Sequence, residues 1–251
     1  LIIDYDTFYK DKTVEVEKIN ISDISKDLQI PKESIRRKVI ELEKKGIIKK
    51  TGKKIFVDRS AFYAAQSFNT LKDLTVLLHE FSKVLKKDKI GERVFEPNEI
   101  SDSIKNNFSF CWYQFYKFLF IFTNRWRAQV KDLETFCVGF LVMLNASHNK
   151  SFRVKDLNIA KYQKLVMSAD NIGLNALSIS EITKIPRPTV VRKLQYLIDN
   201  DYLSINEKKL ITVNIRGNAF KISTDLQNKN IINFSNFVFR IFNQIKVFKS
   251  N

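Results

Sequence analysis

Basic side chains are concentrated in one short stretch of the chain. Residues 31–54 contain ten Lys or Arg and only three Glu, a net charge of +7. Arg binds phosphate oxygens through paired hydrogen bonds, and Lys binds them as a mobile point charge. The stretch therefore predicts binding to a polyanion, either a nucleic acid or an anionic membrane surface. Its candidate contacts are Lys32, Ser34, Arg36, Arg37, Lys38, Lys49, Lys50, Lys53 and Lys54.

The charge of the whole chain agrees with a polyanionic partner. The 251 residues include 43 Lys or Arg and 27 Asp or Glu, a net charge of +16. Drift in composition is the competing explanation, because Lys greatly outnumbers Arg, as an AT-rich genome would produce. The clustering of the charge in residues 31–54 favours the functional explanation.

Residues suited to catalysis or metal binding are scarce. The two histidines, His79 and His148, and the two cysteines, Cys111 and Cys137, do not have the spacing of a metal site. The chain has no glycine-rich phosphate loop and no nucleophile with a base nearby. We expect no enzymatic activity, no cofactor and no metal. Reduced cysteines suit a cytoplasmic protein, and binding to nucleic acid would make it nucleoid-associated.

The apolar stretches are too short to cross a membrane. The longest are residues 108–122, which Gln114 and Lys117 interrupt, and residues 136–144. A spanning helix needs about 20 apolar residues. We expect no membrane partner, with a membrane-surface role for the aromatic stretch as a minor alternative.

The elements that carry the basic residues occur twice. Residues 19–57 and 177–212 share one pattern, and from the proline of each copy onward they align without a gap at an offset of 155. Upstream, residues 22–24 match residues 180–182 at an offset of 158. This predicts an internal duplication whose second copy is three residues shorter at the turn.

Each copy predicts a helix, a turn, a second helix and a hairpin. Ser22 and Ser180 are predicted N-caps. Gly46 is predicted to end the second helix of the first copy, and residues 200–201 accommodate the same left-handed cap in the second copy. The predicted elements are helices at 23–28 and 181–184, longer helices that begin at Pro31 and Pro186, and strands at 47–50, 54–57, 202–205 and 209–213.

This order of elements resembles the winged helix-turn-helix of transcription regulators. The segment SIRRKVIELEKKGII is similar to the MarR-type pattern, and the resemblance covers residues 19–57 and 177–212. It implies that the second helix of each motif enters the major groove and that the hairpin, or wing, lies along the DNA backbone. It also adds candidate DNA contacts in the second copy, namely Arg187, Thr189, Arg192 and Lys193.

The two copies differ in charge. Residues 186–209, the counterpart of 31–54, contain five basic and three acidic residues, a net charge of +2. Val191 stands where the first copy has Arg36. We therefore expect the first copy to be the main DNA-binding copy and the second to be an auxiliary one or a protein-contact module.

The region between the copies is helical and aromatic in pattern. An apolar stripe predicts a helix over 69–87, and residues 108–126 are almost continuously aromatic. A helix that is apolar on every side must be buried on every side, which predicts a homodimer. A ligand pocket for a small-molecule effector, lined by these aromatics, and a pseudo-dimer of the two copies are the alternatives.

The low content of glycine and proline, 6 and 4 residues, favours helix over a β-sandwich or barrel. We predict a mainly α fold with small β-hairpin wings, a tandem winged helix-turn-helix joined by a helical connector. Its function is predicted to be DNA-binding transcription regulation. A plasmid-type replication initiator and a winged-helix protein-interaction scaffold are the alternatives. The expected regions are a first winged helix at 1–60, a connector at 61–150, a second winged helix at 151–215 and a C-terminal helix at 216–251.

Overall fold

The computed structural model is mainly helical, 73%, with two small antiparallel hairpins, which confirms the expected fold class at this level. The chain divides into two compact units, Leu1–Phe115 with Val238–Asn251, and Tyr116–Phe237. The structure describes residues 2–10, 13–16, 20–28, 30–51, 54–59, 68–148, 158, 160–161, 164–165 and 173–250.

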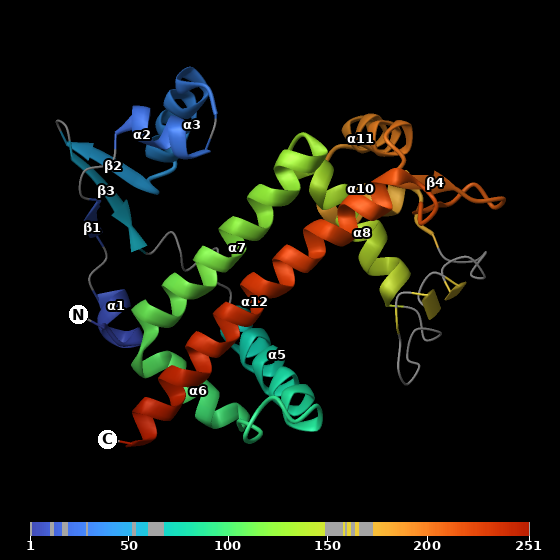
Figure 1. Cartoon of the computed structure of the whole chain (residues 1–251). Helices are drawn as coiled ribbons and strands as arrows, with labels where there is room; N and C mark the ends of the chain where they lie inside the picture. Colours follow the sequence, from blue (N-terminus) through green and yellow to red (C-terminus); the bar gives the residue numbers. More distant parts are fainter. Residues whose placement is uncertain are drawn as a thin grey trace. The chain divides into compact units, whose positions relative to one another are not determined.

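The first unit holds the first predicted copy (Figure 1). Two helices, α7 (Phe108–Val130) and α12 (Asn218–Ser250), belong to both units. The remaining elements are α1 (Tyr5–Lys10), β1 (Thr13–Val16), α2 (Ile21–Leu28), α3 (Lys32–Lys44), β2 (Ile48–Thr51), β3 (Lys54–Asp58), α5 (Phe68–Lys87) and α6 (Pro97–Asn106).

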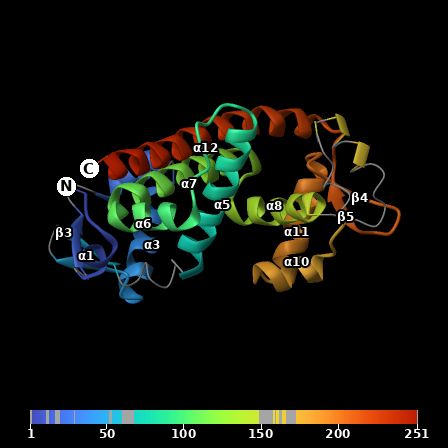
Figure 2. The same cartoon turned by 90° about the horizontal axis from the view of Figure 1, so that it is seen from below.

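The second unit holds the second predicted copy. In Figure 2, α8 lies next to α10 and α11, and α8 packs against both of them and against β5. Besides parts of α7 and α12, the elements are α8 (Leu133–Ser147), α10 (Ala176–Thr183), α11 (Arg187–Asp199), β4 (Leu203–Ile205) and β5 (Ile211–Val213). The helices predicted at 69–87 and 216–251 are confirmed by α5 and α12.

The two copies have the same order of elements. In the first motif, which comprises β1, α2, α3, β2 and β3, helices α2 and α3 pack together and the strands form an antiparallel sheet of order β1-β3-β2. In the second motif, which comprises Leu174, α10, α11, β4 and β5, a single bridge joins Leu174 to Ile211. This bridge takes the place of the pairing between β1 and β3.

The second helix of each motif ends in the same way. Gly46, after α3, has a φ of +71°, and Asp201, at the equivalent place after α11, has a φ of +63°. The following residue donates its backbone N–H to a carbonyl five residues earlier, from Ile47 to Leu42 at 3.0 Å and from Tyr202 to Leu197 at 2.9 Å. Both predicted left-handed caps are confirmed.

The predicted N-caps at Ser22 and Ser180 are wrong. The side chain of Asn20 accepts a hydrogen bond from the backbone N–H of Asp23 at 3.0 Å. Asn175 caps α10 in the same way, accepting from Ser178 at 2.9 Å. Asn caps a helix as well as Ser does, and an Asn lies ahead of both helices at the same offset of 155.

The predicted three-residue gap at the turn is also wrong. The hydroxyl of Ser25 donates to the carbonyl of Ile30 at 2.7 Å, and Ser180 donates to Ile185 at 2.7 Å. Ser180 is therefore the counterpart of Ser25, and the offset of 155 extends through both helices. The match of residues 22–24 with 180–182 was a local likeness that the turn hydrogen bond overrules.

The two hairpins differ in pairing, although the gap-free sequence alignment predicted no difference between them. In the first motif Thr51 pairs with Lys54, whereas in the second Ile205 pairs with Ile211. The strand predicted at 209–213 starts at Ile211, because the side chain of Asn206 accepts from the N–H of Leu210 and closes a longer loop. The hairpin of the second motif thus has the longer loop and the shorter strands.

The aromatic helix α7 is covered by helices of its own chain. In the first unit Phe108 is 1% exposed and its ring contacts Tyr5 and Phe8 of α1. In the second unit Phe118 stacks on Phe237 of α12. In the single chain Tyr113 is 61% exposed, so burial on every side would require the partner of the expected homodimer. The homodimer itself stays a prediction.

The described helices were also compared with the requirements for a membrane-spanning helix. Within the described ranges, no helix combines the length and the apolar character that a membrane crossing requires.

Candidate nucleic-acid interface

The exposed face of α3 carries four of the predicted DNA contacts. Ile35 is the buried residue of this helix, whereas Lys32, Arg36, Arg37 and Lys38 are exposed and Ser34 is half-buried. At 100° per residue, Arg37 lies about 200° from Ile35, opposite the core, whereas Arg36 at about 100° and Lys32 at about 60° lie on the flank. The positions of these side chains agree with the sequence-based expectation.

Both arginines of α3 are held along the helix by weak contacts. Arg36 forms an ion pair with Glu33 at 2.9 Å, and Arg37 donates to the hydroxyl of Ser34 at 3.4 Å. Exposed ion pairs of this kind contribute little to stability. The guanidinium of Arg36 can therefore exchange Glu33 for an anionic or base partner at small cost.

The C-terminal half of α3 is partly neutralised. The carboxylate of Glu41 pairs with Lys38 at 2.7 Å and with Lys45 at 2.8 Å. Hydrogen bonds from these two ammonium groups lower the pKa of Glu41 to about 2. The cluster keeps one net positive charge at neutral pH, which leaves the N-terminal half of the helix as the less compensated part.

The wing of the first motif adds further positive charge. Lys49 and Lys50 of β2 are exposed. The backbone N–H of Lys50 donates to the carboxylate of Glu43 at 3.2 Å, which ties the hairpin to α3. Lys53 lies outside the described residues, and for Lys54 the structure describes the backbone in β3 but not the side chain.

The second motif keeps fewer of its predicted contacts on the surface. Arg187 and Arg192 of α11 are exposed and Thr189 is half-buried. Lys193 is buried, and its ammonium binds the Asp132 carboxylate at 2.8 and 2.9 Å and the Thr135 hydroxyl at 3.2 Å. The expectation that Lys193 contacts DNA is corrected on this ground.

The buried lysine joins α11 to the start of α8. Asp132 is the N-cap of α8 and accepts from the N–H of Thr135 at 2.7 Å, while Glu134 lies 3.2 Å from the Lys193 ammonium. Burial raises the pKa of Asp132, but the hydrogen bonds from Lys193 and Thr135 outweigh burial and the pKa is lowered. The ion pair is therefore complete at neutral pH.

Helices α3 and α11, the second helix of each motif, differ in how many of their side chains are buried. Helix α3 has one buried side chain, Ile35, whereas α11 buries four, Val190, Lys193, Leu194 and Leu197. The difference follows from α8, which packs along α11. Because the free surface of α3 also carries more positive charge, the first motif offers the larger basic face.

The cysteines and histidines form no catalytic arrangement in the described parts of the chain. Burial raises the pKa of Cys111 to about 12 and also raises the pKa of Cys137, so neither thiol is a thiolate at neutral pH. His79 Nδ1 lies 2.7 Å from the carbonyl oxygen of Phe95. Among the same residues, no three His, Cys, Asp or Glu side chains come together as a metal site would need.

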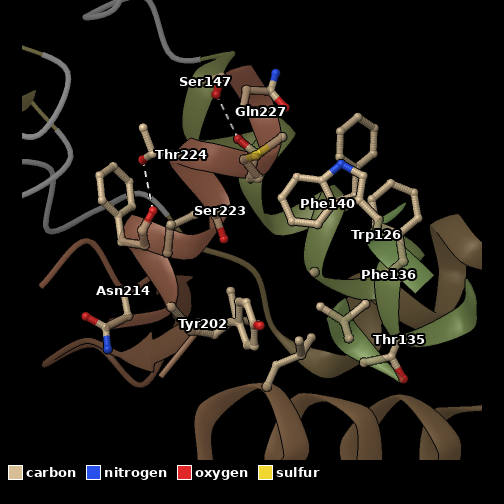
Figure 3. A pocket seen from close by; sticks show the side chains of 18 of the residues that line it. Trp126, Thr135, Phe136, Phe140, Ser147, Tyr202, Asn214, Ser223, Thr224 and Gln227 are labelled. Carbon is tan, nitrogen blue, oxygen red and sulfur yellow. Dashed lines mark hydrogen bonds between the residues drawn. The ribbon is translucent and has the colours of Figure 1, made fainter. Parts of the chain in front are cut away.

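A pocket of about 490 Å³ lies inside the second unit (Figure 3). The residues that form its aromatic wall are Trp126 of α7 and Phe136 and Phe140 of α8. The sequence drew attention to the aromatics of 108–126, but only Trp126 of that stretch lines the pocket. The wall residues of α8 and of α12 each follow helical spacing, but no local pattern shows that these helices meet the other elements of the wall.

The chain matches no protein-family model, and neither the curated proteins nor the solved structures contain a significant match.

Proposed function

We propose that the chain is a DNA-binding transcription regulator whose two motifs are winged helix-turn-helices, the first being the main DNA-binding motif. The observation that carries the proposal is the exposed basic surface of α3, with Arg37 opposite Ile35 and Arg36 on the flank, on a helix that follows α2 and precedes a hairpin. A sheet of order β1-β3-β2 beside two packed helices is the arrangement expected of that motif.

The proposed contacts divide into two kinds. The major groove, about 12 Å wide, admits an α-helix, and an Arg can bind both acceptors of a guanine there. Arg36 and Arg37 are the residues of α3 suited to this role. Lys32, Lys49 and Lys50 are assigned to phosphates, since lysine is a flexible point charge that fixes position without reading sequence.

The second motif is proposed as an auxiliary DNA contact. Arg187 and Arg192 remain exposed on α11, but Lys193 is bound to Asp132 and Val191 replaces the counterpart of Arg36. Removing Arg187 and Arg192 should therefore weaken DNA binding less than removing the arginines of α3.

Selection of bound duplexes from a random pool, followed by titration, tests the proposal. The variant Arg36→Ala/Arg37→Ala should lose about 1–3 kcal/mol of specific binding per base-contacting arginine. Arg187→Ala/Arg192→Ala is the matched control in the second motif. Equal binding by the parent and the Arg36/Arg37 variant contradicts the proposal. Absence of salt-dependent binding by the parent would favour a protein-binding scaffold instead.

A further inference from the structure

The geometry points to a second binding site in this protein, a pocket in the second unit for an uncharged, largely apolar small molecule. Its volume of about 490 Å³ lies within the range of natural ligand sites, about 300–1,000 Å³. The walls come from α7, α8, α11, the hairpin of β4 and β5, and α12. All of these wall residues belong to Tyr116–Phe237.

The lining decides the charge of the ligand. No Lys, Arg, Asp or Glu is present among the described residues that line the pocket. A charged ligand would lose its hydration there without gaining an opposite charge, which costs several kcal/mol or more. The described lining therefore favours an uncharged ligand over ions such as the phosphates that the basic surface of α3 is proposed to bind.

The aromatic wall favours a flat ligand. Trp126 stacks on Phe136 with ring centroids 5.7 Å apart and planes 24° apart, and Phe136 stacks on Phe140 at 5.2 Å and 28°. These rings form one side of the pocket in Figure 3. Aromatic side chains prefer offset stacking or edge contacts with other rings.

Other parts of the pocket wall, on α8 and α12, supply polar groups. The hydroxyls of Ser147 and Thr224 donate to carbonyls of their own helices at 2.9 Å each. Among the described residues, Ser223 and Gln227 have no such partner and are available to a ligand. Trp126 is 8% exposed and its Nε1 is buried, so this residue adds ring surface rather than a donor to the pocket.

A glycine in α8 makes room for the pocket. Gly139 lies in the interior of the helix, where glycine costs about 0.5–1 kcal/mol relative to alanine. A Cβ at this position would come within 3.2 Å of Leu197 Cδ1. The missing side chain lets α11 approach α8 and leaves open space beside them.

The pocket contacts the parts of the second motif that would move with DNA binding. Leu197 belongs to α11, Leu203 to β4 and Val213 to β5, and all three line it. A ligand that binds between these elements and α12 is expected to change the angle or mobility of α11. This regulatory consequence rests on the proposed function, whereas the binding site does not.

The site is tested with N-phenyl-1-naphthylamine, an uncharged aromatic dye whose fluorescence rises in apolar surroundings. The parent should bind the dye saturably with one site per chain. Ser223→Phe should fill the pocket and weaken dye binding by about tenfold or more. Lys221→Phe, an exposed position on the same helix outside the pocket, is the matched control and should bind as the parent does.

Two results would overturn the site: no saturable dye binding by the parent, or equal binding by Ser223→Phe and the parent. Melting temperatures report whether each variant is folded, and Ser223→Leu replaces Ser223→Phe if the larger side chain unfolds the protein. DNA titration with and without dye then tests the regulatory part separately. If DNA affinity is the same with and without bound dye, the regulatory part is refuted. If neither the parent nor any variant binds DNA, the proposed function is refuted, but the dye result still stands.

Discussion

The ion pair between Lys193 and Asp132 should stabilise the second unit, and its two partners should differ in importance. The Lys193 side chain is 8% exposed and the Asp132 side chain is 41% exposed. Removing one partner of a buried pair is costly because it leaves the other charge uncompensated. The greater loss is therefore expected when Asp132 is changed, because the charge left behind is the more deeply buried one.

The magnitudes follow from what each variant leaves in place. Asp132→Asn keeps an N-cap for α8 and an acceptor oxygen but removes the negative charge closest to the ammonium, and we expect a loss of about 2 kcal/mol in the free energy of unfolding. Lys193→Met keeps the apolar stem and leaves Asp132 partly hydrated, with an expected loss of about 1 kcal/mol. The double variant should lose less than the sum of the two.

Urea unfolding followed by tryptophan fluorescence measures these losses. All variants are made in a Trp112→Phe background, so that Trp126 is the fluorescent reporter. Trp126 belongs to the buried cluster of the second unit. Lys38→Met is the matched control, because Lys38 is the counterpart of Lys193 and its side chain is 73% exposed. The reasoning fails if Lys193→Met is no more destabilising than Lys38→Met, or if the double variant loses the full sum.

The same pair predicts a dependence on pH. The pKa of Asp132 is lowered below its ordinary value of 3.8 in the folded protein. A lowered pKa contributes stability above the unfolded value, and this contribution is lost as the pH falls through the folded value. The difference in unfolding free energy between the parent and Asp132→Asn should be constant from about pH 5 to 7 and should shrink in stronger acid. A difference that is unchanged in strong acid would contradict the assignment.

Three further predictions concern the wing, the helix cap and assembly. Lys49→Ala/Lys50→Ala should reduce the slope of log K against log salt by about 0.9 for each phosphate that these lysines neutralise in the parent complex, and unchanged slopes would make them a solubility feature. Asn175→Ala should cost about 1 kcal/mol by removing the cap of α10, whereas Asn175→Asp should restore the parent's stability; chemical unfolding measures both. Light scattering should give twice the chain mass of 29.4 kDa for the expected homodimer, and a monomer at micromolar concentration would favour the pseudo-dimer.

The order of elements in each motif could be predicted from sequence because local rules decide it. Apolar residues at i, i+4 and i+7 placed Ile35 and Val190 in the core faces of α3 and α11, where both are buried. Gly46 and Asp201 marked the helix ends because few residues tolerate a left-handed backbone. The exposed face of α3 followed from the same periodicity.

Local pattern failed where a choice between similar residues depended on geometry. Ser22 and Asn20 are both good N-caps in sequence, and the backbone entering α2 selected Asn20. The same kind of choice made Ser180 the counterpart of Ser25 and lengthened the loop of the second hairpin. A short match of residue types could not distinguish these registers, since each satisfies the same local preferences.

Contacts between distant segments were decided by the tertiary structure alone. Lys193 and Lys38 occupy equivalent places in the two copies, yet Lys193 is buried because α8 brings Asp132 against α11, 61 residues away in sequence. The pocket likewise exists only where five separate elements meet around Gly139. The sequence by itself determined which residues are charged, apolar or able to turn the chain. Which charges stay in water and which apolar walls enclose a space depended on long-range packing, because burial is a property of the neighbours that the fold supplies.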